Sequence, residues 1–295
     1  MKSSVSAVSA APSRSNDLVA LAKPRLNLLV VVSAVAGYVM ASGDTHDVWR
    51  LLSVIAGTGL VAGGASAFNQ ILEREPDALM QRTRLRPMAD GRLATREAWM
   101  FGAALTLAGL GILAFGANLL SAVVAFVTMA SYAAVYTPLK RYSSFATVVG
   151  AIPGALPPVI GWAAALDELS QGAWVLFGIL FLWQIPHFLA IAWMYRNDYA
   201  RAGFPMLTVV KPDGIQTGYQ SVVYLVALIP LSLLPTIQGM TGILYFSGAL
   251  TLGLLFFVTG VGIALRRDNP SAKRLLLASI VYLPVLLVLM IIDKV

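Results

Sequence analysis

The sequence predicts an all-α protein that crosses a membrane nine times. Three observations predict this fold class: a very apolar composition, nine apolar runs of bilayer-spanning length, and basic residues confined almost entirely to alternate connections. Hydrophobic residues make up 58% of the 295 residues and charged residues only 12%, whereas a soluble domain carries roughly 25% charged residues. A core of this size cannot hide so much apolar surface from water, so we infer that the solvent is lipid.

The nine apolar runs are close to the about 20 residues that a spanning helix needs. They cover residues 25–42, 51–71, 98–116, 118–137, 144–165, 173–194, 220–237, 241–264 and 274–292. The third and fourth runs are separated by a tight turn near Ala117 and Asn118, since together they are too long for one span. Pro153, Pro157 and Pro158 interrupt the fifth run, and a helix with these prolines must kink. Such a kink either borders a cavity or is a packing feature.

The placement of charge supports both the number of spans and their orientation. With the amino terminus inside, all 21 Lys and Arg residues except Arg50 and Lys294 fall in the inner connections or the adjoining helix ends. This distribution follows the positive-inside rule, so we expect a cytoplasmic amino terminus and a periplasmic carboxyl terminus. It also argues against nucleic-acid binding, because the basic residues are spread over five segments at one membrane face.

The beginning of the chain differs in composition from the rest. Residues 1–17 are small and polar and lack an apolar core of signal-peptide length. We expect a flexible cytoplasmic tail over residues 1–17 and a single transmembrane domain over residues 18–295. Without a convincing presequence, the inner (plasma) membrane of a bacterium is the expected location. Cysteine is absent, which excludes disulfides and thiolate chemistry.

The most polar stretch runs from Asn69 to Pro87, directly after an apolar run. Asn69, Glu73 and Asp77 are spaced four residues apart, so a helix would place all three on one face. Oxygen-bearing side chains suit a hard divalent cation, and the arginines at positions 82, 84 and 86 favour a magnesium-bound phosphate over a bare metal. The same stretch is equally consistent with a charged loop at the membrane edge.

Pro76 lies inside this spacing and should change the local structure. Proline removes a backbone hydrogen bond and clashes with the preceding turn, so the helix should kink or end near Glu75. Asp77 would then belong to the next short segment.

Other polar residues gather at the same membrane face or inside a span. The inner loop 138–143 carries two basic residues, and the inner loop 195–219 contains Asp198. The sixth run contains Trp183 and His187, and an ionisable residue within a span is a functional candidate by default. The alternative is a histidine that is hydrogen-bonded to a neighbouring helix.

Taken together, these motifs resemble those of the UbiA-type intramembrane prenyltransferases. The pattern Asn69-x3-Glu73-x3-Asp77-x2-Met80-x-Arg82-Thr83 looks like the first aspartate-rich motif of that family, in the form found in members that farnesylate protohaem IX. Further matches are Lys23-Pro24-Arg25, YTPLKR at 136–141, GAIPGALPPVIGW at 150–162 and HFLAIAWMYRNDYARAGFPML at 187–207. The resemblance covers nearly the whole chain after the tail.

The resemblance implies a fold and a reaction. It implies nine helices around a central cavity that opens to lipid. It also implies transfer of the farnesyl group of farnesyl diphosphate to the 2-vinyl group of haem B, which gives haem O, with Mg²⁺ as the cofactor. Haem A synthase or assembly factors of a terminal oxidase are the protein partners that it implies.

The resemblance further implies roles for individual residues. The expected catalytic and magnesium-holding residues are Asn69, Glu73, Asp77 and Asp198. The expected diphosphate-binding residues are Arg82, Lys140, Arg141 and Arg201. The expected haem pocket contains Trp183, His187 and Tyr195, with His187 as a candidate contact for the haem iron or a propionate.

The chain departs from the family pattern in the second motif. That pattern has two acidic residues at four-residue spacing, whereas Tyr195 and Tyr199 hold the spacing here and Asp198 is the only carboxylate of the segment. One magnesium ion, or a second held by Asn197 and Asp198, is compatible with the sequence.

Other functions remain open at this point. They are prenyl transfer to a quinone precursor or a chlorin, secondary transport, and a structural role in an oxidase. The acidic groups concentrate at one membrane face rather than at the midplane, and no inverted repeat is evident, which argues against a transporter.

Overall fold

A computed structural model describes residues 13–43 and 47–295 of the chain. Within this part, nine helical segments are long and apolar enough to cross a membrane, which confirms the expected all-α, nine-span fold. In chain order the helices are α1 (Arg14–Ala22), α2 (Pro24–Ala41), α3 (Val48–Leu72), α4 (Arg74–Leu79), α5 (Thr95–Gly116), α6 (Leu119–Ala130), η1 (Ser131–Tyr136), α7 (Thr137–Leu139), α8 (Ala146–Ala155), α9 (Pro157–Leu166), α10 (Gln171–Met194), α11 (Arg196–Arg201), α12 (Leu207–Val210), α13 (Ile215–Ile237), α14 (Ile243–Arg266) and α15 (Asn269–Ile292).

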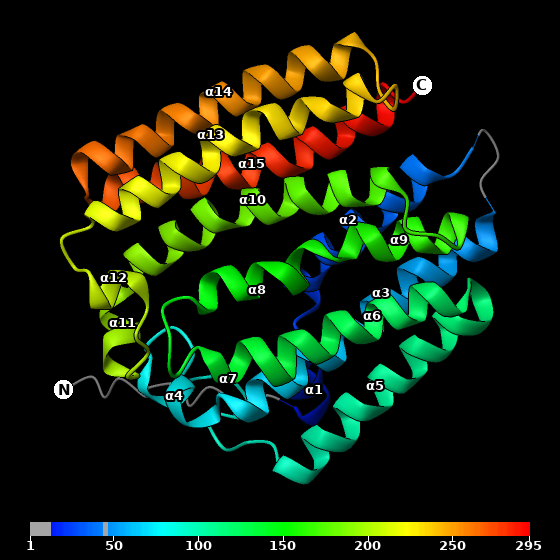
Figure 1. Ribbon diagram of the computed structural model, residues 1–295. Coiled ribbons are helices and arrows are strands. Elements are labelled where there is room, and N and C mark those ends of the chain that lie inside the picture. The colour runs from blue at the N-terminus through cyan, green and yellow to red at the C-terminus, as the bar shows by residue number, and fades with distance from the viewer. Residues whose placement is uncertain (1–12, 44–46) are drawn as a thin grey trace, which may run out of the picture.

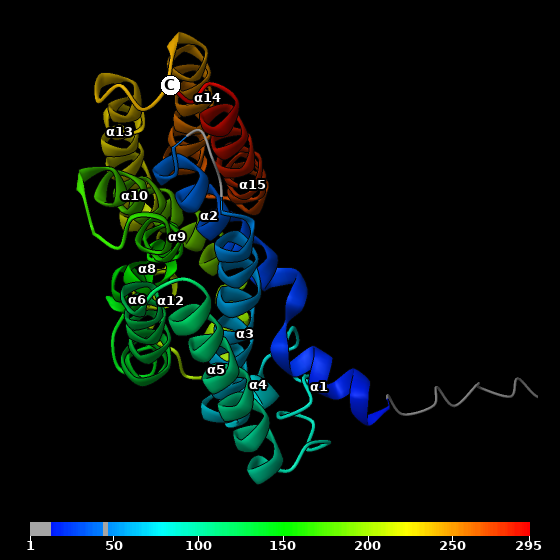
Figure 2. The same cartoon turned by 90° about the vertical axis from the view of Figure 1, so that its right-hand side faces the viewer.

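The long helices run alongside one another, and the short ones gather at one end. In Figure 1, α13, α14 and α15 lie together along one edge of the molecule, with α10 between them and the remaining spans. The short helices α4, α7, α11 and α12 lie at one end of the bundle, and the carboxyl terminus lies at the other. We call the end with the short helices the inner end. Figure 2 shows α1 bending away from the bundle beside α3 and α4.

The start of the chain is more ordered than a free tail. The Ser13 side chain caps α1 by accepting from the backbone N–H of Asn16, and the buried Asp17 forms an ion pair with Arg92. Residues 14–17, which the sequence places in the tail, form the first turn of α1, and the cap and this ion pair hold them there. Residues 1–12 lie outside the described part of the chain.

Close contacts between helices account for several glycines of the spans. A Cβ at Gly57 would lie 2.9 Å from the carbonyl oxygen of Gly109, and one at Gly64 would lie 2.8 Å from that of Gly102. Small residues at these positions therefore allow α3 and α5 to approach backbone to backbone. The outward faces of the spans carry exposed apolar side chains such as Leu254, Leu255 and Val258 on α14, which suits a lipid environment.

Two spans are broken in ways that matter for the interior. The fifth span divides at Leu156 into α8 and α9, as its prolines indicate. The fourth span continues from α6 into the π-helical turn η1, which widens the helix just before Pro138. Such π-helical turns are frequent at functional sites because they change the direction of a few side chains.

Candidate active site

The break between α3 and α4 sets up the inner end of the molecule. Proline clashes with the carbonyl of the residue four positions earlier, and for Pro76 that residue is Leu72, where α3 ends. The helix therefore stops three residues earlier than Glu75, the expected position. The freed carbonyl oxygen of Leu72 accepts a hydrogen bond from the Arg141 guanidinium at 2.6 Å.

Asn69, Glu73 and Asp77 keep their common direction across this break. The backbone N–H of Glu73 donates to the carbonyl of Asn69 at 2.9 Å, and that of Asp77 donates to the carbonyl of Glu73 at 2.8 Å, so the four-residue step is preserved. All three side chains are buried, with exposed fractions of 4% or less. Three polar groups that are buried at a helix end need partners from other elements.

Each of the three side chains meets a basic residue. Lys140 contacts the Glu73 carboxylate at 2.6 Å, and Arg86 contacts that of Asp77 at 2.6 Å. The Lys23 ammonium donates to Asn69 Oδ1 at 3.3 Å, and no carboxylate lies within ion-pairing distance of Lys23 among the described residues. We call this group of side chains the polar cradle: Lys23, Asn69, Glu73, Asp77, Arg86 and Lys140.

Asp198 approaches the cradle from α11. Its carboxylate forms an ion pair with Arg201 and accepts from the backbone N–H of Arg82 at 3.3 Å. The Arg82 guanidinium lies over the ring of Tyr195 at 4.7 Å and donates to the Tyr199 hydroxyl at 3.3 Å. The stretch after Asp77 and the second motif therefore lie at the same end of the molecule and in direct contact.

The acidic groups do not form a compact metal cage. Among the described residues, no three His, Asp or Glu side chains are grouped closely enough to hold a metal ion. One carboxylate oxygen is nevertheless left open, because Asp77 Oδ1 is buried and has no hydrogen-bond partner within the described chain. A buried anionic oxygen without a partner is a site that a cation would satisfy. The oxygen donors of the cradle fit Mg²⁺ in this respect.

Lys140 is held in its charged form at the edge of the cradle. Burial alone lowers the pKa of Lys140, but the facing Tyr136 and the Glu73 carboxylate outweigh burial and raise the pKa above its usual value. The ammonium also lies 4.7 Å from the centre of the Tyr136 ring. Lys140 therefore remains cationic throughout the physiological pH range.

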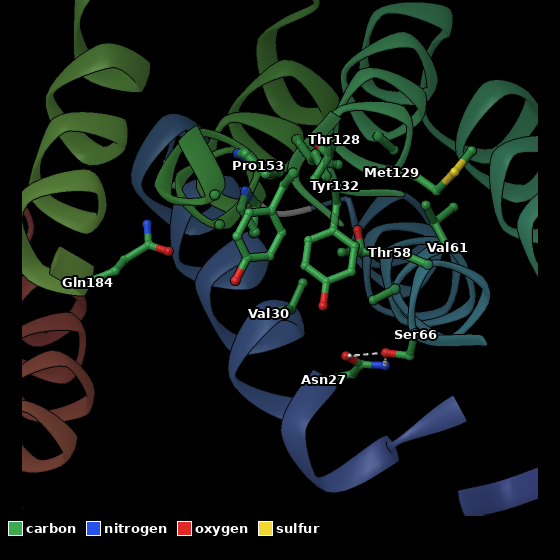
Figure 3. A pocket seen from close by; sticks show the side chains of 18 of the residues that line it. Asn27, Val30, Thr58, Val61, Ser66, Thr128, Met129, Tyr132, Pro153 and Gln184 are labelled. Atoms are coloured by element: carbon green, nitrogen blue, oxygen red, sulfur yellow. Dashed lines mark hydrogen bonds between the residues drawn. The ribbon is translucent and has the colours of Figure 1, made fainter. Parts of the chain in front are cut away.

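An apolar cavity of about 250 Å³ lies inside the bundle. Its wall comes from α2, α3, α6, η1, α8, α9 and α10, and it includes Pro153 and Pro157 of the broken fifth span. In Figure 3 the side chain of Tyr132 extends between Val30 and Val61, and Gln184 lies on the opposite side of the cavity. The kinked fifth span therefore borders a cavity, one of the two possibilities that its prolines left open.

Tyr136 joins the cavity to the cradle. Its ring lines the cavity and contacts Lys140, which is bound to Glu73. Asn69 Nδ2 donates to the Thr137 hydroxyl at 3.2 Å, so the residue after Tyr136 is anchored to the cradle as well. An anionic group held by the cradle could therefore carry an apolar chain that enters the cavity past Tyr136.

Trp183 and His187 face a different direction. His187 Nδ1 is 2.7 Å from the Ser279 hydroxyl on α15, and Trp183 Nε1 donates to the Ser279 carbonyl at 2.9 Å. On α10 the cavity is lined by Gln184 and Phe188, one position further along the helix in each case. A step of one residue turns a helix by about 100°. Trp183 and His187 therefore do not line this cavity, and His187 makes the helix-to-helix hydrogen bond that was the alternative. Their place in a haem pocket stays a prediction.

The remaining expected ligand-binding residues occupy the inner surface. Tyr195, Arg82, Asp198 and Arg201 line a second, polar pocket of about 500 Å³. Arg141 donates to the Leu72 carbonyl at the end of α3, whereas the ion pairs of Glu73 and Asp77 in the described chain are with Lys140 and Arg86. Its expected contact with diphosphate stays a prediction.

Sequence reasoning missed the roles of three residues in the cradle and at the cavity mouth. Lys23 appeared only as part of a motif before the first span, and Arg86 only as one of three arginines. Tyr136 preceded a basic loop and carried no signal of its own. The pairing of Arg86 with Asp77 depends on the fold of the loop between them, which spacing alone does not reveal.

The fold and this site define an intramembrane enzyme that handles an anionic group attached to an apolar chain. The model of the UbiA prenyltransferase family matches residues 30–282. The chain belongs to the UbiA prenyltransferase family and is a prenyltransferase.

Sequence similarity to an individual protein extends over almost the whole chain. The chain is 50% identical over 287 residues to the protein named Protoheme IX farnesyltransferase from Solibacter usitatus, with 94% of this chain and 98% of that protein covered.

Solved structures share the fold. Digeranylgeranylglyceryl phosphate synthase superposes with a TM-score of 0.79 at 18% identity, covering 94% of this chain and 97% of that chain. A UbiA homologue from Archaeoglobus fulgidus, bound to GPP and Mg²⁺, superposes with a TM-score of 0.61 at 13% identity, covering 93% of this chain and 99% of that chain.

Proposed function

We propose that this chain transfers the farnesyl group of farnesyl diphosphate to the 2-vinyl group of haem B and so produces haem O. The observation that carries the proposal is the junction of the polar cradle with the apolar cavity at Tyr136, which suits a diphosphate joined to an isoprenoid chain. The identity of the acceptor rests on the 50% identical relative that is named Protoheme IX farnesyltransferase.

The cradle is proposed to hold the diphosphate together with Mg²⁺. Asn69, Glu73 and Asp77, with Asp198 beside them, would hold the metal, and the open oxygen of Asp77 supports this assignment. When bound, Mg²⁺ neutralises the negative charge that grows on the departing diphosphate.

The basic side chains of the cradle are proposed to stabilise the same charge. Lys140 lies against the ring of Tyr136, which lines the cavity, and Lys23 has an amide rather than a carboxylate as its partner. Arg82 and Arg201 lie further out, on the polar pocket, and are proposed to bind the outer oxygens. Charge-assisted hydrogen bonds of this kind are stronger than neutral ones, and they strengthen further as the leaving group develops charge.

The cavity is proposed to hold the farnesyl chain and to keep bulk water from its allylic carbon. The rings of Tyr132, Tyr136 and Phe188 line it and would favour positive charge on that carbon. The electron-rich vinyl group of haem B would attack this carbon, and water would then trap the cation formed next to the porphyrin ring. Tyr195, on the polar pocket, is retained as a contact for the acceptor.

We further propose that the protein lies in the bacterial inner membrane with the cradle at the cytoplasmic side. In this arrangement residues 18–295 act as one prenyltransferase domain, the amino terminus is cytoplasmic and the carboxyl terminus periplasmic. The positive-inside distribution of Lys and Arg supports this orientation. Haem A synthase, or an assembly factor of a terminal oxidase, is the proposed protein partner.

The proposal is tested by incubating the purified protein in lipid with farnesyl diphosphate, Mg²⁺ and one acceptor at a time, with analysis by mass spectrometry. Haem B should yield a product with the mass of haem O, and omission of Mg²⁺ should abolish it. Product from 4-hydroxybenzoate or a chlorin, with none from haem B, would replace the proposed acceptor. No prenyl transfer to any acceptor would contradict the proposed reaction.

A further inference from the structure

The cavity has a definite depth, which follows from the direction of each helix that lines it. On α3, which runs toward the cradle, the lining residues extend from Ser66 back to Thr58. At about 1.5 Å per residue, this stretch covers about 12 Å. On α6 the deepest lining residue is Ala125, and on α9 it is Ile160.

The far end of the cavity is closed by buried side chains. Ile160, Ala125 and Thr58 are each 2% exposed or less. Ile160 and Ala125 belong to the main hydrophobic core, together with Ala122 and Leu113. Of the three end-wall side chains, Ile160 is the largest.

The backbone on either side of Ile160 is packed closely against α2. A Cβ on Gly37 of α2 would lie 2.0 Å from the Pro158 carbonyl oxygen, and one on Gly161 would lie 1.8 Å from that of Ala34. Helices α2 and α9 therefore touch backbone to backbone on both sides of Ile160. Close-packed interiors of this kind do not yield readily to an added group.

The depth of the cavity matches one prenyl chain length. An extended chain advances about 1.2 Å per bond, so the roughly eleven bonds from C1 to the end of a farnesyl chain reach about 13 Å. A fourth isoprene unit adds about four bonds, or about 5 Å, and would have to displace Ile160.

We propose that Ile160 sets the length of the prenyl donor by closing the far end of the cavity, with Ala125 opposite it. The proposal rests on the proposed function for the class of donor, a prenyl diphosphate, but not on the identity of the acceptor. Ile160 is thus a specificity-determining residue that acts on the last isoprene unit, far from the reacting carbon.

Binding of non-hydrolysable thiodiphosphate analogues of geranyl, farnesyl and geranylgeranyl diphosphate tests the proposal without an acceptor. The wild-type protein in lipid, with Mg²⁺, should bind the farnesyl analogue at least about tenfold more tightly than the geranylgeranyl analogue, since even one extra methylene can have that effect in a fitted pocket. Ile160→Ala should remove most of this preference. Ala125→Leu should shift the preference toward the geranyl analogue.

Two further variants distinguish a specific effect of Ile160 on chain length from a general loss of packing or folding. Val159→Ala makes a similar truncation at the buried neighbour of Ile160 that does not line the cavity, and it should leave the ratios of the three affinities within about twofold of wild type. Ile160→Val removes a single methyl group and should give an intermediate shift if Ile160→Ala fails to fold.

The outcomes are distinguishable. Equal affinity of the wild type for the farnesyl and geranylgeranyl analogues would contradict the claim that the end wall limits chain length. It would indicate that the prenyl chain leaves the cavity for the lipid. Unchanged ratios in Ile160→Ala or Ile160→Val would overturn the role of Ile160. Tight, length-dependent binding without any haem O would leave the inference standing and count against the proposed acceptor.

Discussion

At the scale of single residues, the polar cradle pairs each carboxylate with a basic residue and leaves one basic residue over. Glu73 is paired with Lys140, Asp77 with Arg86, and Asp198 beside the cradle with Arg201. Lys23 contacts only an amide oxygen in the described part of the cradle. A buried or half-buried cation without a counter-charge is unfavourable unless a ligand supplies one, so the cradle is suited to an anion.

We expect Lys23→Met to lower kcat/KM for farnesyl diphosphate at least about tenfold, because it removes a cation from the departing diphosphate. Lys23→Arg should retain part of the activity. The exposed Lys211→Met variant is the matched control, since it removes the same charge outside the cradle. Wild-type kinetics for Lys23→Met would show that this ammonium does not act on the donor.

Glu73→Gln and Asp77→Asn should each reduce turnover at least about tenfold, because each removes the negative charge that orients cradle cations and, in the proposed site, the metal. Glu75→Gln is the control, since Glu75 lies in the same short helix with 74% of its side chain exposed. The measurement is the steady-state turnover of each variant at saturating Mg²⁺. Equal rates for all three variants would remove the two carboxylates from the mechanism.

At the scale of elements, the ends and faces of helices decide which residues reach the site. Pro76 ends α3 at Leu72, and Arg141 from the next inner loop binds the carbonyl that the proline leaves free. On α10, Gln184 and Phe188 face the cavity while Trp183 and His187 bind α15. Both arrangements depend on a neighbouring element as much as on local sequence.

Because Arg141 binds the carbonyl that Pro76 leaves free, substitutions at these two residues should have coupled effects on stability. Arg141→Ala should lower stability by about 1 kcal/mol or less, which corresponds to a fall in Tm of about 2–4 °C at most. In a Pro76→Ala background the residue at 76 regains an N–H that can bond to Leu72, so the same change should have at most half the effect. Thermal unfolding of the four proteins in one detergent measures this coupling, and strictly additive shifts would contradict it.

The two faces of α10 predict different consequences for adjacent residues. Phe188→Ala should raise KM for the donor several-fold, because it removes apolar surface from the cavity. His187→Ala should lower Tm through loss of the Ser279 contact while leaving the haem Soret band and haem affinity unchanged. A changed Soret band in His187→Ala would indicate that His187 contacts the haem acceptor.

At the scale of the whole molecule, the spans bring three inner segments that are far apart in sequence to one end of the bundle. The loop after Asp77 contacts α11 through Arg82 and Asp198, and Met80 packs with Phe204 and Met206. The cradle is therefore assembled from α2, α3, α4 and the two inner loops only when all the spans are in place. This arrangement puts the charged chemistry at one end and the apolar cavity behind it.

The proposed orientation in the membrane can be measured directly because the chain has no cysteine. Tyr142→Cys lies in an inner loop with the native side chain 79% exposed, and Glu168→Cys lies in an exposed outer connection. A membrane-impermeant maleimide should label Glu168→Cys in spheroplasts and Tyr142→Cys only in inverted vesicles. The opposite pattern would reverse the orientation.

The sequence by itself determined the number and extent of the spans and the end of the molecule at which the polar residues gather. These features follow from local properties: the length and hydropathy of each run, the distribution of Lys and Arg, and the four-residue spacing of Asn69, Glu73 and Asp77. Each is decided by how a short segment partitions between lipid and water, so no knowledge of distant contacts is needed.

Only the tertiary structure decided which side chains meet. In the folded chain Arg86 pairs with Asp77, and Arg141 donates to the Leu72 carbonyl. His187 contacts α15, and Ile160 lies at the far end of the cavity. The apolar spans have almost no polar face, so nothing in their periodicity indicates their rotation about the helix axis. That rotation is set by close packing between helices, a property of several segments at once.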